Sequence, residues 1–140
     1  MNRKIKTLVQ KRSEFALRKL LEEARIQEKD DKEFKNFIIG TPSMILQNGF
    51  GQSLAFWASK VSKTNKNKSE DRYYFVLSTI AEWLKEMRIY NETKDKSGYV
   101  GLIKCISNDF TQQEYLKAQK ETISILEWLK VYAQAFGRDE

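Results

Sequence analysis

The sequence predicts an all-α fold, a compact bundle of about six helices that forms a single domain over residues 1–140. Residues that interrupt helices are rare, because the chain contains one proline and six glycines. Long stretches carry apolar residues at helical spacing, and short polar stretches separate them. No stretch shows the alternation of apolar and polar residues that is typical of a half-buried strand. The length is that of one ordinary domain, which is enough to bury a core.

The first helix is expected over residues 2–28, because apolar residues recur there on one helical face. They are Ile5, Leu8, Val9, Phe15, Ala16, Leu20 and Ala24. The charged run 28–33 predicts a solvated turn and then a second helix that stops near Gly40. Thr41 as N-cap with Pro42 at the first helical position could start a new helix. A kinked continuous helix is equally compatible with the sequence.

The remaining helices are expected over residues 43–48, 51–60, 70–89, 99–106 and 111–136. The helix at 70–89 is apolar nearly all round in its first half, which predicts a place at the centre of the bundle. Thr111 and Glu114 have the spacing of a capping box at the start of the last helix, which Gly137 ends.

Residues 61–71 (VSKTNKNKSED) are polar and rich in lysine, so they are expected to form an exposed loop. Ser69 can cap the helix that follows. Glu70 and Asp71 would then lie in its first turn, where negative charge favours the helix dipole.

Histidine is absent and Cys105 is the only cysteine. The missing histidines remove the usual nucleophile activation, the usual zinc ligands and the commonest general base near neutral pH. A single cysteine excludes an internal disulfide and fits a reducing compartment, where Cys105 is expected as a small buried hydrophobe. We therefore expect no catalytic residue, metal, cofactor or small-molecule substrate. The amino-terminal residues lack the apolar region of a signal peptide, so a cytoplasmic location is expected.

One uncharged stretch, residues 36–59, is long enough in principle to span a bilayer. It contains a proline, three glycines and several amide and hydroxyl side chains, which would be costly in lipid. We interpret it as buried protein and expect no membrane association.

The stretch QNGFGQSLAFWASK (47–60) places a glycine on either side of Phe50. A phosphate-binding loop would need a preceding strand, whereas the residues on both sides are helix-like. Gly49 is therefore expected to supply a positive φ at a helix end, and Gly51 to let the next helix pack closely. A helix-turn-helix DNA reader is a further alternative. Residues 52–60 are mostly apolar with one basic residue, which disfavours readout of base edges.

The net charge of +6 favours anionic partners. Two clusters of basic residues contain no acid. The first, near the amino terminus, consists of Arg3, Lys4, Lys6, Lys11 and Arg12, and the second, in the middle of the chain, consists of Lys60, Lys63, Lys66 and Lys68. Spaced lysines suit contact with a phosphate backbone without reading of sequence, although a solvated surface would look the same residue by residue. The candidate nucleic-acid-binding residues are Lys11, Arg12, Lys60, Lys63, Lys66, Lys68 and Arg72.

Aromatic residues adjoin the lysine-rich loop. Tyr73, Tyr74 and Trp57 could stack on bases, but at helical spacing such residues more often belong to a core. Trp83 and Trp128 lie in apolar helices and are expected to pack there.

The segment TPSMILQNGFGQSLAFWASK (41–60) resembles the signature of the small α-helical subunit of the type III-B CRISPR effector, the Cmr complex. The matching positions are Pro42, Asn48, Gly49, Gly51, Gln52, Ala55, Phe56 and Lys60, while Phe50 replaces the more usual leucine. Residues 13–20, 81–86 and 127–136 are similar to further parts of the family. The resemblance thus touches nearly the whole chain, and 41–60 is its specific part.

This resemblance implies a non-catalytic subunit that stacks in several copies beside the backbone subunits that hold the CRISPR RNA, with a basic face along the target RNA. It implies that Lys60 is a basic family position and that Asn48 and Gln52 structure the corner. For Lys63, Lys66 and Lys68 the RNA role depends on charge alone. The alternative from the residues is a free-standing helical nucleic-acid-binding or regulatory module, and an enzyme ranks third.

Overall fold

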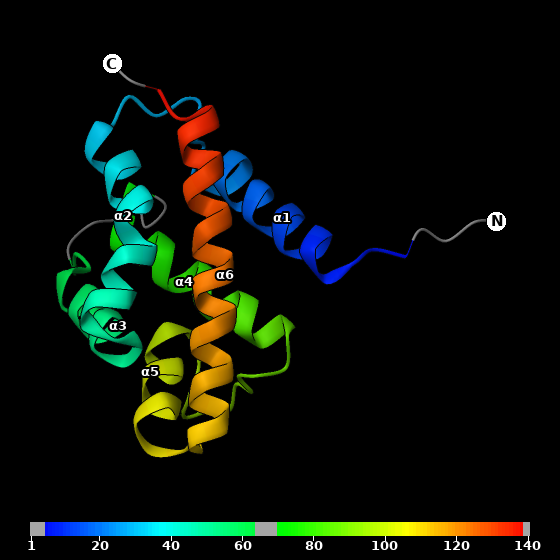
Figure 1. Ribbon diagram of the computed structural model, residues 1–140. Helices are drawn as coiled ribbons and strands as arrows, with labels where there is room; N and C mark the ends of the chain where they lie inside the picture. The colour runs from blue at the N-terminus through cyan, green and yellow to red at the C-terminus, as the bar shows by residue number, and fades with distance from the viewer. Residues whose placement is uncertain (1–4, 64–69, 139–140) are drawn as a thin grey trace.

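The structure is a computed structural model that describes residues 5–63 and 70–138. Within these ranges it contains six α-helices, one π-helical segment and no strand. Figure 1 shows the order α1 (Leu8–Arg18), η1 (Lys19–Glu23), α2 (Lys32–Asn48), α3 (Phe50–Lys60), α4 (Arg72–Glu86), α5 (Gly98–Asn108) and α6 (Gln112–Phe136). The predicted all-α class and the approximate number of helices are confirmed.

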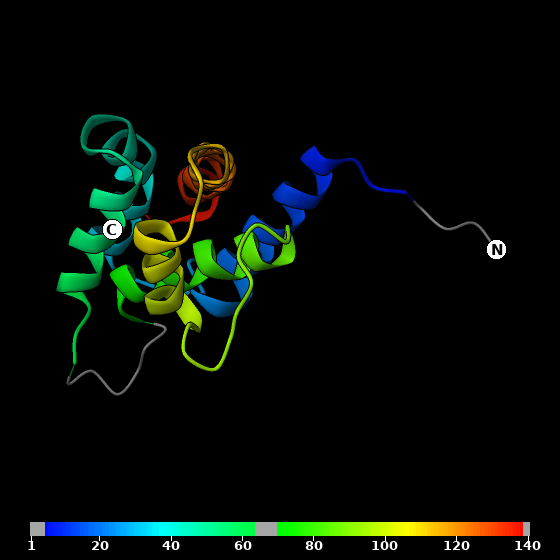
Figure 2. The ribbon, with the colours of Figure 1, turned by 90° about the horizontal axis from the view of Figure 1, so that it is seen from below.

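The longest helix, α6, organises the bundle. It contacts α1, α2 and α4. Seen from below along the axis of α6, α2 and α3 lie on one side of it and α1 on the other, with α4 and α5 beneath (Figure 2). The two helices that carry the 41–60 signature therefore form one flank of the molecule.

The centre of the core is α4, as predicted from its nearly continuous apolar first half. Eight of its residues are buried, among them Phe75, Leu77 and Trp83. Trp83 packs against Phe15 of α1, with ring centroids 5.0 Å apart. Phe75 packs against Phe34 of α2 at 5.6 Å. Cys105 is buried, as expected.

The first helix is shorter than the predicted range 2–28. It begins at Leu8, because Thr7 and Gln10 form a capping box. The Thr7 hydroxyl accepts from the backbone N–H of Gln10, and the Gln10 side-chain oxygen accepts from the backbone N–H of Thr7. After Arg18 the chain widens into η1, where the N–H of Ala24 reaches the carbonyl of Lys19 at 2.9 Å. It then leaves the helix at residue 25, whose φ is 52°.

Helix α2 continues through Gly40 and Pro42, so of the two alternatives the continuous helix is correct, and a stop near Gly40 with a restart at Thr41 is wrong. A proline inside a helix has no N–H for the carbonyl four residues earlier, which here belongs to Ile38. The Thr41 hydroxyl donates to that carbonyl at 2.8 Å. A side chain thus replaces the missing backbone donor, and this allows the helix to run on.

Helix α4 begins at Arg72, two residues later than predicted, so the expectation that Glu70 and Asp71 lie in its first turn is wrong. Asp71 is its N-cap, accepting from the backbone N–H groups of Tyr73 and Tyr74 at 3.0 and 3.1 Å. Ser69, the predicted cap, lies outside the described residues. The capping box at Thr111 is confirmed, and α6 ends at Gly137 as predicted.

The uncharged stretch 36–59 folds into most of α2, the corner at Gly49 and most of α3. Across residues 5–63 and 70–138, we find no helix with both the length and the apolarity that crossing a membrane requires.

Candidate nucleic-acid interface

Gly49 joins α2 to α3 in a single-residue corner. Its φ of 91° and ψ of 154° lie in a region that residues with a Cβ rarely adopt. Its N–H donates to the carbonyl of Ile45 at 2.8 Å, and its carbonyl accepts from Ser53 at 3.0 Å. The same residue therefore ends one helix and starts the next, and the predicted positive φ is confirmed.

The far side of the corner is attached to α6. The N–H of Gly51 donates to the Tyr115 hydroxyl at 3.1 Å, and Phe50 packs edge-on against the Tyr115 ring at 5.5 Å. A Cβ added at Gly51 would stand 3.5 Å from Ile106 and from Tyr115, which is ordinary contact. The close packing expected at Gly51 thus still leaves room for a Cβ. These contacts fix the direction in which α3 leaves the corner.

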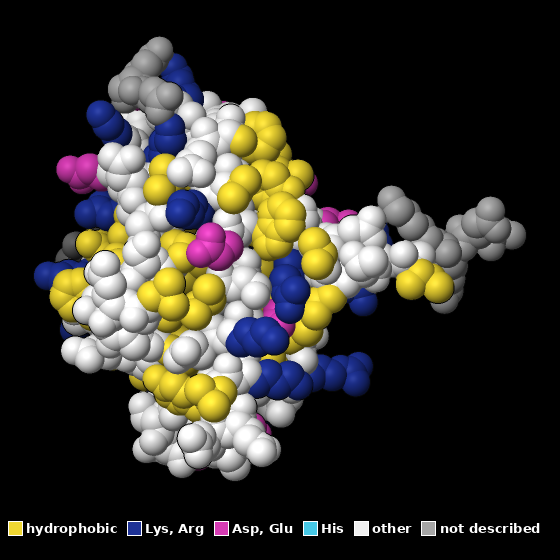
Figure 3. Space-filling view, viewed as in Figure 1, with side chains coloured by type: hydrophobic (Ala, Val, Ile, Leu, Met, Phe, Trp, Pro, Cys, Tyr) yellow, Lys and Arg dark blue, Asp and Glu magenta, His cyan; other side chains and the backbone are white. Residues whose placement is uncertain are grey.

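Helix α3 has one buried face and one exposed face. Phe50, Leu54 and Trp57 fill the buried face, so Trp57 belongs to the core. The exposed face carries Gln52, Phe56 and Lys60 at successive spacings of four residues, which places them in one row. We call this row, with Lys63 at its end, the α3 face. At the left edge of Figure 3, over α3, yellow and dark blue side chains adjoin.

The α3 face holds some of the predicted site residues. Lys60 and Lys63 are exposed at its carboxyl end, and Gln52 and Asn48 are exposed at the glycine corner. Pro42 lies away from this face, buried inside α2. Lys66 and Lys68 fall outside the described residues.

The loop that carries the lysines is closed at its base by Asp71. Besides capping α4, the Asp71 carboxylate accepts from the N–H of Ser62 at 2.8 Å. This bond joins Ser62, two residues after α3, to Asp71, the residue before α4. It therefore fixes the two ends of the loop relative to each other.

Arg72, just beyond the loop, lies near an acid as well as a ring. Its guanidinium is 3.7 Å from the Glu33 carboxylate and stands over the Tyr73 ring at 4.9 Å. Tyr73 is half-buried and packs against Phe37 at 4.7 Å, and Tyr74, also half-buried, packs edge-on against Tyr99. The two tyrosines thus pack against neighbouring aromatic residues.

The two amino-terminal candidates, Lys11 and Arg12, differ in their exposure. Lys11 is exposed on α1. Arg12 is turned inward, with its Nε and terminal nitrogen donating to the Glu121 carboxylate at 2.9 and 2.6 Å. The Trp83 indole N–H donates to the same carboxylate at 3.0 Å. The hydrogen bonds from Arg12, followed by that from Trp83, hold the pKa of Glu121 below its ordinary value despite burial.

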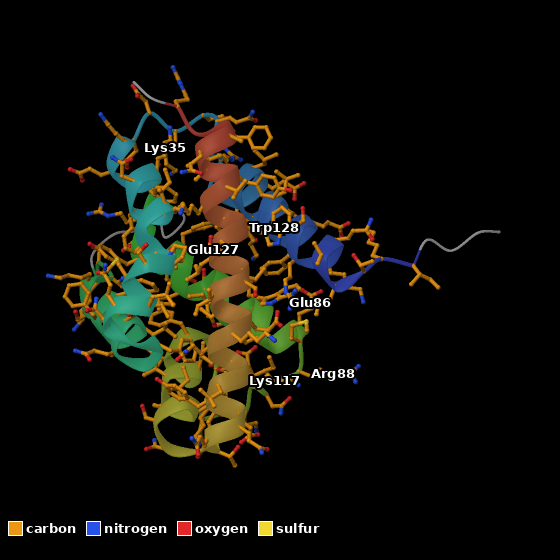
Figure 4. All side chains as sticks on the ribbon, viewed as in Figure 1. Lys35, Glu86, Arg88, Lys117, Glu127 and Trp128 are labelled. Carbon is orange, nitrogen blue, oxygen red and sulfur yellow. The ribbon has the colours of Figure 1, made fainter. Side chains whose placement is uncertain are left out.

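The sequence reasoning missed one feature of this surface. It assigned no functional role to Phe56, whose exposure could have been found only by deciding which of two adjacent aromatics faces the core. Two other exposed basic residues that it passed over, Arg88 and Lys117, lie outside the α3 face. Figure 4 shows Lys117 on the amino-terminal half of α6 and Arg88 just beyond α4, directed outward.

The fold and its charges define a small, basic, all-helical protein with a flank on which lysines follow a glycine corner. Comparison with protein families identifies a match over residues 8–136 to the family described as CRISPR-associated protein (Cas_Cmr5). The chain therefore belongs to this family of small structural subunits of the type III-B CRISPR (Cmr) complex. The resemblance drawn from residues 41–60 is confirmed.

Proposed function

We propose that this chain is a non-catalytic architectural subunit of the Cmr complex that contacts the target RNA backbone through the α3 face and the lysine-rich loop. It stacks with copies of itself beside the backbone subunit that holds the CRISPR RNA. The lysine-rich segment after α3 carries the proposal, because residues 60–69 contain four lysines and no Asp or Glu. A run of lysines of this kind neutralises phosphates without reading bases.

The described part of this stretch supports the same assignment. Lys60 and Lys63 are exposed at the end of α3, on a helix fixed by the glycine corner and by the Asp71 closure. Lys11 is a second candidate, because it is exposed on α1. Arg12 and Arg72 each lie beside a carboxylate, so we assign them a smaller share of phosphate contact.

Contact with neighbouring subunits is supported by exposed apolar side chains. Ile5 is 91% exposed, and Leu8 and Val9 are also exposed on the outer turns of α1. A yellow stripe follows the carboxyl half of α6 in Figure 3, the region in which Figure 4 labels Trp128. Exposed apolar side chains that gather on one surface are typical of protein interfaces.

The RNA contact is tested by charge reversal. We expect the double variant Lys60→Glu and Lys63→Glu to bind single-stranded RNA more weakly, with thermal stability unchanged because both residues are exposed. The slope of the logarithm of the binding constant against the logarithm of the salt concentration should become shallower. We expect a change of about 0.7 for each lost phosphate contact, or about 1.4 for the pair. Reversal of Lys66 and Lys68 as well should extend the loss.

The matched control reverses Lys117 and Lys120, which are exposed on α6 and change the net charge equally. Equal loss of affinity in both pairs would show an effect of total charge and contradict the assignment to the α3 face. Binding is measured by fluorescence anisotropy at two salt concentrations, with circular dichroism melting beside it. Tight binding of duplex DNA by the isolated chain would instead favour a free-standing DNA-directed module.

The subunit contacts are tested separately, in cells. We expect Leu8→Gln with Val9→Gln to fold normally and to recover less of the other Cmr subunits when the tagged chain is purified. Full recovery of those subunits by this variant would contradict the role given to the outer turns of α1.

A further inference from the structure

We propose that Phe56 is a stacking platform for one nucleobase, so that the α3 face takes single-stranded rather than double-stranded nucleic acid. This inference rests on the proposed function, since it adds a base contact to the proposed phosphate contacts. It assigns to Phe56 a role that phosphate neutralisation alone does not need.

Phe56 is not required by the core. Its side chain is 49% exposed, whereas the adjacent Trp57 is fully buried. The buried face of α3 is already filled by Phe50, Leu54 and Trp57. The Phe56 ring is therefore available for contact with a partner outside this chain without any loss of core packing.

The surroundings of Phe56 favour a polyanion as that partner. The Lys60 ammonium lies 5.4 Å from the centroid of the Phe56 ring, four residues along the same helix face. Lys63, three residues further along the chain, is exposed, and the stretch 34–69 contains no Asp or Glu. Apolar neighbours around an exposed phenylalanine would favour a protein partner, whereas Gln52, Ser59 and Lys60 are its neighbours at helical spacings of three and four residues.

One nucleotide can satisfy both side chains. Its base can stack on the Phe56 ring, and its phosphate can pair with the Lys60 ammonium. The ammonium then moves from its place over the ring to the phosphate, which leaves the ring face to the base. Every base has a π-face, so the contact does not depend on sequence. In a duplex the bases are stacked on one another and cannot reach the ring. The pair therefore selects a single strand by its chemistry.

The test compares two substitutions at position 56 in the full chain. Phe56→Leu keeps an apolar residue on an exposed helix face but removes the π-system, and Phe56→Trp keeps it. We expect Phe56→Leu to lose about fivefold or more in affinity for a single-stranded oligoadenosine RNA. The salt slope should stay unchanged, because no charge is removed, and affinity for an RNA duplex should stay unchanged too. Phe136→Leu, at an exposed phenylalanine in the last turn of α6, is the matched control.

A spectroscopic readout reports stacking directly. We expect the indole of Phe56→Trp to be quenched when oligoadenosine is added, and that of Phe136→Trp to be unaffected. Wild-type affinity in Phe56→Leu, equal loss for single strand and duplex, or absence of quenching would each overturn the stacking platform. Normal RNA binding by Phe56→Leu combined with loss of co-purifying Cmr subunits would identify a protein contact at Phe56 and also overturn it.

The two proposals fail in different ways. If reversal of Lys60 and Lys63 weakens binding while Phe56→Leu does not, the phosphate contact stands and the stacking platform is wrong. If neither change weakens binding, or if the wild-type chain binds no RNA at low salt, both are wrong.

Discussion

The contact that joins α1 to α6 gives the sharpest test of the structure. Two hydrogen bonds run from Arg12 to Glu121, and the Glu121 carboxylate also accepts from Trp83. The Arg12 and Glu121 side chains are 15% and 9% exposed. Because the pair is largely removed from water, loss of one partner leaves a buried charge without compensation. The substitution Glu121→Gln does this with almost no change of size.

The expected loss in the free energy of unfolding depends on which hydrogen bonds the amide of Glu121→Gln can still accept. In the wild type Oε1 of Glu121 accepts from both Arg12 Nε and Trp83, and Oε2 accepts from the terminal nitrogen of Arg12. The amide oxygen can keep the first two bonds, but not with the strength of a carboxylate, and the amide NH2 group cannot accept from the terminal nitrogen. We expect a loss of about 3 kcal/mol in the free energy of unfolding, at the low end of the range for breaking a buried ion pair. For a chain of this length that corresponds to a fall of about 10 °C in Tm. Glu127→Gln, at an exposed position on the same helix (Figure 4), should change stability by less than about 0.5 kcal/mol.

The pH dependence adds a second readout. The pKa of Glu121 is lowered in the folded chain, first by the hydrogen bonds from Arg12. A lowered carboxyl pKa stabilises the fold fully above the ordinary glutamate value of 4.5, and that contribution is lost as the pH falls through the folded pKa. The difference in stability between the wild type and Glu121→Gln should therefore be constant near neutral pH. It should shrink progressively as the pH falls below 4.5.

Urea unfolding of four proteins completes the experiment: wild type, Arg12→Met, Glu121→Gln and the double variant. The double variant has no buried charge here, and its amide oxygen can serve Trp83. We therefore expect it to recover a large part of the loss in Glu121→Gln, with a coupling free energy of about 1–3 kcal/mol. This account of the contact would be refuted if the losses of the two single variants added up in the double variant. A Glu121→Gln variant as stable as the wild type would refute it too.

Four further substitutions test the corner and α2. Gly49→Ala should cost about 1–3 kcal/mol in urea unfolding because of the positive φ, whereas Gly40→Ala, inside α2 with open space at its Cβ, should stabilise by about 0.5–1 kcal/mol. Tyr115→Phe removes the acceptor of the Gly51 N–H and should cost about 1 kcal/mol by thermal melting. Thr41→Val removes the hydroxyl that replaces the donor missing at the proline and should also cost about 1 kcal/mol, so an unchanged Tm would count against that replacement.

Features that depend on residues close in sequence were predictable. The Thr111 capping box, the positive φ at Gly49 and the end of α6 at Gly137 each depend on chemistry within about one helical turn. The start of α1 depends on an equally local motif, the pair Thr7 and Gln10, whose capping box the prediction did not use. The apolar stripe extended past this cap, and periodicity alone does not show where a helix begins.

Features that depend on distant residues could not be read from the sequence. Arg12 and Glu121 are 109 positions apart, so Arg12 looked like one more member of a basic cluster. Lys19 is a similar case, since it is buried at the start of η1 and paired with Glu23 and with Glu82 of α4. A basic residue whose partner lies on another helix is indistinguishable in sequence from a solvated one. Its charge counts toward the composition but not toward a binding surface.

The uncharged stretch 36–59 has two explanations, one for each of its faces. Its inner face is apolar because Ile38, Ile45 and Leu54 are buried in the core. Its outer face is also uncharged, although Leu46 and Phe56 are exposed and the fold would accept Lys or Glu there. Packing accounts for the first face and not for the second. The outer face is therefore the part of the signature that we propose makes contacts outside the chain, and Phe56 is the residue at which those contacts are best tested.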